Sequence, residues 1–267
     1  MHGELAQLIA IAAHGSAWLA GRTGAAPPEL EGASSTFQYV RGVRFELAGS
    51  LLKSSIISDD VADWFAGVRR RGITRLWLAI PGSGGVDRKL LAFTGTTAWY
   101  LVGTTRKNQG EVWRAAWTVG DGDDPDHRIW DVDYRGRRMS EAAPPPSNMA
   151  DAAERLKAAL TRAAAFATDQ GIDEWAALFD AALKLGDAPD PVPPYHPDMF
   201  PPTAYGRPAR RLLAMATRSD VFGGMGSWND LGFEPGGATL EYEEISAELY
   251  ATVAAAFMAA VNGPIER

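Results

Sequence analysis

Apolar and polar residues alternate between positions 37 and 47, which is the clearest strand pattern in this chain. The apolar set is Phe37, Tyr39, Val43, Phe45 and Leu47, and polar or charged residues stand between most of its members. A period of two places alternate side chains on opposite faces of a β-strand. The pattern therefore predicts a strand over 37–47 with its apolar side chains directed into a core.

The spacing then becomes helical. Apolar residues three or four positions apart follow Ser58, namely Val61, Trp64, Phe65 and Val68. Ser58 is a suitable cap, acidic residues occupy the first turn, arginines occupy 69–71 and Gly72 follows them. These charges match the helix dipole, and the glycine is a typical stop. We predict one helix that ends near Gly72, and we attribute its arginines to the helix end.

Further β-rich segments occupy the rest of the first half. They cover residues 73–80, 90–94, 98–102, 111–119 and 128–135. No helical pattern lies between the last four, so the sheet is predicted to be largely antiparallel. An apolar helix is predicted before it, from the spacing of Leu5, Leu8, Ile9 and Ala12.

Near residues 142–148 the sequence AAPPPSN introduces an alanine-rich helical region. Four helices are predicted there: one after the cap Asn148, one capped by Asp173, one with Pro208 in its first turn, and one over 241–262. The proline-rich segment 187–202 should form an extended strap, pinned to the core by Tyr195, Met199 and Phe200. We therefore predict an α+β fold in which residues 1–143 form a mostly antiparallel sheet with helical cover. Residues 144–267 form a helical part, packed with it into one compact unit.

Composition restricts the possible chemistry. The chain has 267 residues, no cysteine and a net charge of −7, which excludes disulfides and thiolate chemistry. Residues 1–140 carry 17 Lys and Arg against 15 Asp and Glu, or +2, and the remainder therefore carries −9. An acidic chain does not favour nucleic-acid binding and suits a basic protein partner. Solvated helix faces explain the same charges without a partner.

The N-terminal apolar segment follows Glu4 and is shorter than the roughly 20 residues of a membrane span. We expect a cytoplasmic protein with no membrane association. The turn PGSGGVD at 81–87 meets neither phosphate-loop pattern, so no cofactor is expected.

The stretch from Val221 to Phe233, VFGGMGSWNDLGF, is the leading candidate for a ligand or partner site. Glycines, small polar residues and one large aromatic residue occur together in a connection longer than two helix caps require. The candidate residues are Gly224, Gly226, Ser227, Trp228, Asn229 and Asp230. The alternative is a capped turn pinned by Trp228, with the glutamates at 241–248 stabilising the start of a helix.

Three weaker chemical patterns occur elsewhere in the chain. Asp131 and Asp133 lie on one face of the 128–135 strand and could share a divalent cation, although nearby arginines offer them ordinary ion pairs. His14 beside Ser16 resembles a base and a nucleophile, and His196 with Asp198 resembles part of a metal site. Each set lacks the further ligands or partners that such sites need.

The leading functional hypothesis is a cytosolic, bacterial-type binding protein, such as an immunity-type or accessory factor that masks a basic protein partner. The alternative is a carboxylate-dependent enzyme, such as a transferase or hydrolase. It would use Asp131 with Asp133, or Asp230 with the neighbouring glutamates. The sequence does not indicate an oligomeric state.

Overall fold

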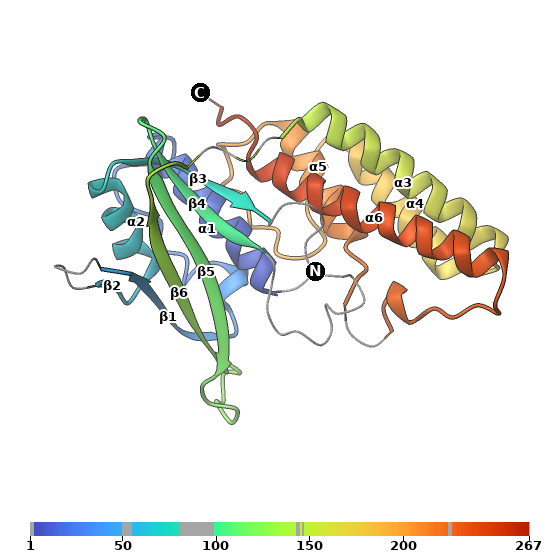
Figure 1. Cartoon of the computed structure of the whole chain (residues 1–267), viewed down its shortest axis with the longest axis horizontal. Helices are drawn as coiled ribbons and strands as arrows, with labels where there is room; N and C mark the ends of the chain where they lie inside the picture. Colours follow the sequence, from blue (N-terminus) through green and yellow to red (C-terminus); the bar gives the residue numbers. More distant parts are fainter. Residues whose placement is uncertain are drawn as a thin grey trace.

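The computed structural model describes residues 3–49, 55–80, 99–142, 145, 147–223 and 226–266. Its sheet and its helical region lie next to each other (Figure 1). Six strands form one sheet in the order β2-β1-β6-β5-β4-β3. Their bounds are β1 Val40–Leu47, β2 Ile56–Ser58, β3 Ile73–Ala79, β4 Tyr100–Thr105, β5 Gly110–Val119 and β6 Trp130–Met139. The described strands thus all lie in the first half of the chain, and the predicted α+β class is confirmed.

The sheet is mixed but mostly antiparallel. β1 runs parallel to β6, and the other neighbouring strands are antiparallel. The long β5–β6 hairpin pairs continuously from Gly110 with Met139 to Val119 with Trp130. The parallel contact arises because β6, the last described strand in the chain, returns beside β1 after β3, β4 and β5 have formed the other side of the sheet.

Several predicted boundaries in this half were wrong. Phe37 ends a short 3₁₀ helix, η1 (Ser35–Phe37), whose first turn is held by the side chain of Ser34, and the strand begins only at Val40. Tyr39 consequently remains exposed rather than directed into the core. Ser58 belongs to the short edge strand β2, and Asp60 caps helix α2 (Val61–Arg70) by accepting from the Asp63 amide at 2.6 Å. The predicted strand at 90–94 lies outside the described residues.

Aromatic side chains fill the inner face of the sheet under α2. Phe45 stacks on Trp64 with ring centroids 4.5 Å apart and on Tyr134 with centroids 4.6 Å apart. Trp113 meets both Phe45 and Trp64 edge-on. Such close aromatic packing adds to the free energy gained from burying the rings. The alternation over β1 and β6 therefore identified the inner face correctly from Val43 and Val132 onward.

Helix α1 (Gly3–Leu19) is buried almost all around its circumference. It contacts β3 most extensively, and also α2 and α6. Gly15 allows this close approach, because a Cβ atom there would lie 2.4 Å from the Phe65 ring and 2.6 Å from Leu76. The continuous apolar character of its sequence thus reflects a helix shared by two layers.

The second half contains the four predicted helices. They are α3 Met149–Asp169, α4 Asp173–Asp187, α5 Arg207–Ser219 and α6 Gly237–Val261. Asn148 caps α3 as predicted, whereas Asp173 is the first residue of α4 rather than its cap. α6 begins at Gly237, earlier than predicted, and is long and apolar enough to cross a membrane. However, 61% of its most apolar window is buried inside the protein, as in a core helix.

Side chains from α1 and α6 close the outer edge of β3. The Ser16 hydroxyl donates to the Leu76 carbonyl at 2.8 Å and accepts from the Leu76 amide at 3.1 Å. Asn262, which follows α6, accepts from the Leu78 amide at 2.9 Å and donates to its carbonyl at 2.8 Å. The edge of a sheet is normally a row of unpaired backbone groups. Here the backbone groups of Leu76 and Leu78 are paired, and these bonds join β3 to α1 and to the end of α6.

We predict that Asn262→Ala lowers the free energy of unfolding by about 2–4 kcal/mol, because a buried amide and a buried carbonyl both lose their partner. Urea unfolding measures this loss. Asn148→Ala, which removes an exposed helix cap, serves as a control and should cost about 1 kcal/mol. Limited proteolysis should not release two stable halves of the chain, and recovery of such halves would contradict this description of the edge.

Candidate functional site

Trp228 lies at the centre of the stretch that the sequence singled out. Its side chain is fully buried, and its Nε1 donates to the Ser246 hydroxyl of α6 at 2.7 Å. The Tyr242 hydroxyl donates to the Trp228 carbonyl at 2.5 Å. The predicted anchoring role of Trp228 is therefore confirmed.

The indole ring also joins elements that are distant in sequence. Its centroid lies 6.4 Å from Phe166 of α3, 5.4 Å from Trp175 and 5.0 Å from Phe179 of α4, and 5.5 Å from Tyr242 of α6. Trp228 thus fixes the C-terminal end of α3 against the N-terminal ends of α4 and α6. In Figure 1 these helix ends lie at the end of the helical region away from the sheet.

The polar neighbours of Trp228 form a capped turn around η3 (Trp228–Asp230). The Asp230 carboxylate accepts from the Ser227 amide at 3.0 Å, and the Ser227 hydroxyl donates to the Gly223 carbonyl at 3.3 Å. Gly226 has φ +78°, a value that side chains disfavour. Asn229 is half-buried, and Gly224 lies outside the described residues. The turn explains the local composition, and a binding role for these residues stays a prediction.

An acidic surface surrounds this turn. The sequence has no Lys, Arg or His in 163–183 or in 219–265, the segments that meet around Trp228. Exposed carboxylates at that end are Asp169, Asp173, Glu174, Asp230, Glu234, Glu241 and Glu244. Arg162 of α3 pairs with Glu244 and Glu248 but leaves the other carboxylates of this group unneutralised. We call this group the acidic end.

Local structure explains only part of the acidic end. Asp173 and Glu174 lie in the first turn of α4, where the helix dipole favours negative charge. Asp169 is the last residue of α3, where the same dipole opposes a carboxylate. Helix stabilisation therefore does not account for Asp169.

The Asp131 and Asp133 pair lies on the outer face of the sheet. Arg41 holds the Asp131 carboxylate with two bonds, from Nε at 3.0 Å and from Nη2 at 2.5 Å. Asp133 lines a groove of about 200 Å³ together with Arg44, Glu46 and Arg135. Within the described part of the chain, no three His, Asp or Glu side chains gather as a metal site. A cation at this position would have to displace Arg41.

The structure also brings together a polar cluster that the sequence did not reveal. The Asp198 carboxylate accepts from the Ser35 amide at 2.8 Å and from the Ser35 hydroxyl. His196 Nδ1 lies 3.0 Å from the Ser35 Oγ, and His14 Nε2 lies 2.9 Å from the Asp198 carbonyl. These contacts, with buried Met199 and Phe200, hold the proline-rich strap against α1 and η1. Tyr195 is exposed, so its predicted role in pinning the strap was wrong.

The direction of the hydrogen bonds shows what this cluster can do. Ser35 donates its only hydroxyl proton to Asp198, so His196 Nδ1 must donate to the Ser35 oxygen. In a serine hydrolase the imidazole instead accepts the serine proton. Burial alone would raise the pKa of Asp198, but hydrogen bonds from Ser35 outweigh it and lower that pKa. In this arrangement the Asp198 carboxylate acts as a hydrogen-bond acceptor that holds the strap, and we call the cluster the strap clamp.

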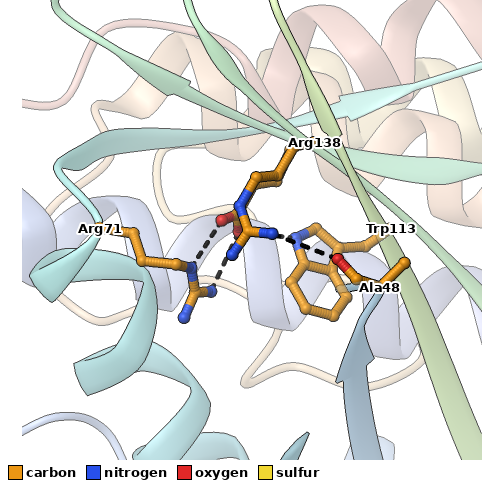
Figure 2. A network of polar contacts seen from close by, with 5 residues as sticks. Ala48, Arg71, Trp113 and Arg138 are labelled. Carbon is orange, nitrogen blue, oxygen red and sulfur yellow. Dashed lines mark hydrogen bonds and ion pairs between the residues drawn. The ribbon is translucent and has the colours of Figure 1, made fainter. Parts of the chain in front are cut away.

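Figure 2 shows a second polar network, in which Glu111 is buried and Arg138 is exposed. Glu111 accepts from Arg71 Nε at 2.6 Å and Nη2 at 3.0 Å, and from Trp113 Nε1 at 3.3 Å. Arg138 donates to the Ala48 carbonyl at 3.2 Å. Arg71 is the C-cap of α2, as its predicted place at a helix end implied. The bidentate ion pair links α2 to β5 and leaves Glu111 little exposed surface for a ligand.

No protein-family model matches this chain, and searches of curated proteins and of solved structures likewise find no match. Function is therefore inferred from the geometry and charge of the chain itself.

We predict that Trp228→Ala lowers the free energy of unfolding by about 3–5 kcal/mol, since it removes a fully buried aromatic side chain. Asp230→Ala should cost about 1 kcal/mol through the lost cap bond. Glu234→Ala, at an exposed neighbour, should change it by no more than about 0.5 kcal/mol. Thermal or urea unfolding of the three variants checks the order. Equal losses for Asp230 and Glu234 would contradict the capped turn.

The strap clamp should make stability fall on mild acidification. Burial lowers the pKa of His14 and of His196 below the ordinary value of 6.5, although Asp198 acts in the opposite direction on both. A histidine with a lowered folded-state pKa contributes its full stability above the unfolded pKa. That contribution is lost as pH falls from about 6.5 toward the folded pKa.

Urea unfolding between pH 7.5 and 5 measures this loss, and the double variant His14→Gln, His196→Gln should show a flatter dependence. His127→Gln, in the β5–β6 loop, is the matched control and should keep the wild-type dependence. An identical pH profile in wild-type protein and the double variant would refute the assignment to these two side chains.

Proposed function

We propose that this protein is a non-enzymatic binding protein that masks a basic segment of a protein partner through the acidic end. The observation that carries the proposal is the meeting of α3, α4 and α6 around Trp228 in segments without any Lys, Arg or His. An immunity-type or accessory factor would use such a surface.

Charge of one sign on a protein surface acts over a longer range than direct contacts. It raises the rate of encounter with an oppositely charged partner and disfavours acidic competitors. The unneutralised carboxylates at this end, and Asp169 in particular, provide such a field at some cost to the local helix. Binding of this kind weakens with salt, because the Debye length falls to about 8 Å at physiological ionic strength.

Rigid support is the second feature that suits binding. The surface carboxylates lie on turns and helix ends whose positions are fixed by buried rings, principally Trp228 and Phe179. A partner would therefore not have to order a flexible loop, and the entropic cost of association is smaller. The exposed side chain of Leu240, 75% accessible in the first part of α6, adds an apolar contact beside Glu241.

The enzyme alternative has less support from the geometry. It depended on free carboxylates, whereas Arg41 binds Asp131 and the Ser227 amide binds Asp230. We therefore place the binding role first.

The proposal is tested by affinity capture from native cells, using wild-type protein and a variant with a neutralised acidic end. The variant replaces the carboxylates that are least engaged in caps or ion pairs: Asp169→Asn, Glu174→Gln, Glu234→Gln and Glu241→Gln. A basic protein should be recovered stoichiometrically with wild-type protein. Its affinity for the variant should fall at least about tenfold, with little change in melting temperature.

A matched control neutralises four exposed carboxylates elsewhere, namely Glu29→Gln, Asp59→Asn, Glu154→Gln and Asp190→Asn. This variant has the same net charge and should bind like wild-type protein. Equal losses in both variants would show that total charge alone controls binding. Capture of an acidic partner, or of none, would refute the proposal.

A further inference from the structure

The outer face of the sheet carries arginines that the acidic end does not explain. Side chains on this face alternate with the buried set of Trp113, Tyr134 and Gly136, so Arg114, Arg135 and Arg137 point away from α1 and α2. All three are exposed. We propose that they form an oxyanion-binding site for a small molecule that carries phosphate groups. The proposal is independent of the acidic end, which has the opposite charge and lies on the helical region.

The strand register places two of these cations directly opposite each other. Arg114 of β5 pairs with Arg135 of β6 within a regular antiparallel ladder. Directly opposed residues have Cβ atoms about 4.5–5.5 Å apart, and like charges in this relation destabilise a sheet. Arg137 lies two residues along β6 on the same face, opposite Val112. The β5–β6 side of this face therefore carries three positive charges close together, while Glu46 of β1 and Asp133 of β6 lie beside Arg135 in the same groove.

Several other arginines in the described part of this protein have acidic partners. Arg41 binds Asp131, Arg71 binds Glu111, and Arg162 binds two glutamates. Among the described residues, Arg114, Arg135 and Arg137 make no ion pair or hydrogen bond with another side chain. Glu46 is the register neighbour of Arg135 on β1 but does not form an ion pair with it. Their guanidinium donors are thus available to a ligand.

The surroundings favour an anion over simple hydration. The Arg114 guanidinium lies over the Tyr100 ring, 5.1 Å from its centroid, which restricts the side chain before any ligand binds. Val102 and Val112 are buried on the same face beside this row and form an apolar border. Electrostatic attraction between guanidinium and oxyanion is stronger next to apolar groups than in open water.

Arginine chemistry defines the ligand class. Each guanidinium presents a planar fork of donors that matches two oxygens of a phosphate or a carboxylate. Three cations in one patch favour a multiply charged group, which makes a phosphate-bearing molecule a better match than a single carboxylate. The phosphate could belong to a free metabolite or to a lipid headgroup, and the site chemistry is the same for both.

The test uses inorganic pyrophosphate as the probe. Thermal unfolding and isothermal titration should show saturable binding and a rise in melting temperature beyond that produced by chloride at equal ionic strength. Arg114→Gln and Arg135→Gln should each weaken binding at least about tenfold, because a charge-assisted hydrogen-bond pair is lost. Arg70→Gln, an exposed arginine on α2, is the matched control and should bind like wild-type protein.

A second readout separates this site from a structural role. Without the probe, Arg114→Gln and Arg135→Gln should melt about 1–3 °C higher than wild-type protein, since an opposed like charge has been removed. That gain should shrink in high salt. A lower melting temperature in both variants, or an equal loss of binding in Arg70→Gln, would overturn the proposal. So would a wild-type response no larger than that to chloride.

A further arm identifies the source of the phosphate. Wild-type protein is mixed with vesicles of phosphatidylcholine alone and with vesicles that also contain phosphatidic acid. Binding of pyrophosphate without vesicle binding supports a free phosphate compound as the ligand. Binding to the phosphatidic acid vesicles that is lost in Arg114→Gln supports the same site with a headgroup as the source. Vesicle binding that persists unchanged in Arg114→Gln and Arg135→Gln, without pyrophosphate binding, would overturn the site.

Discussion

The closed edge of β3 is the constraint on which the rest of this structure depends. A strand at the edge of a sheet exposes alternate amides and carbonyls. Burying these groups without hydrogen-bond partners costs more free energy than most single contacts contribute. Ser16 and Asn262 satisfy Leu76 and Leu78 from two different helices. One of these side chains belongs to α1 and the other follows α6. The edge of β3 is therefore fully paired only when both helices are packed against the sheet.

Helix α1 gains its unusual burial from the same arrangement. It lies against the sheet and also meets α6, and Gly15 removes the side chain that would otherwise separate it from Phe65 and Leu76. The strap then crosses from the helical region to His14 and Ser35, which adds a second polar connection between the halves. Hydrophobic burial supplies much of the stability in such an interface, while the few directed hydrogen bonds fix its geometry.

The core joins the two halves of the protein, whereas the surface charges separate into an acidic group and a basic group. The acidic end belongs to helix termini and turns held by Trp228, and the arginines of the outer face belong to two paired strands. Both surfaces lie on rigid elements, so their charged groups can be spaced by the backbone rather than by mobile side chains alone. A surface that keeps like charges together retains some unfavourable energy in the free protein, which a ligand of opposite charge relieves.

The sequence by itself determined the class of the fold, the two halves and most elements, because periodicity records which face of a strand or helix is buried. It also identified Trp228 as an anchor and Arg71 as a helix end. It could not place Val40 rather than Phe37 at the start of β1, since the Ser34 cap competes locally with the strand. Only the tertiary structure decided which distant residues meet. The Ser35–Asp198 clamp, the Asn262 edge bonds and the Arg114–Arg135 opposition each depend on register or docking, and residues far apart in the chain carry no local pattern that specifies either.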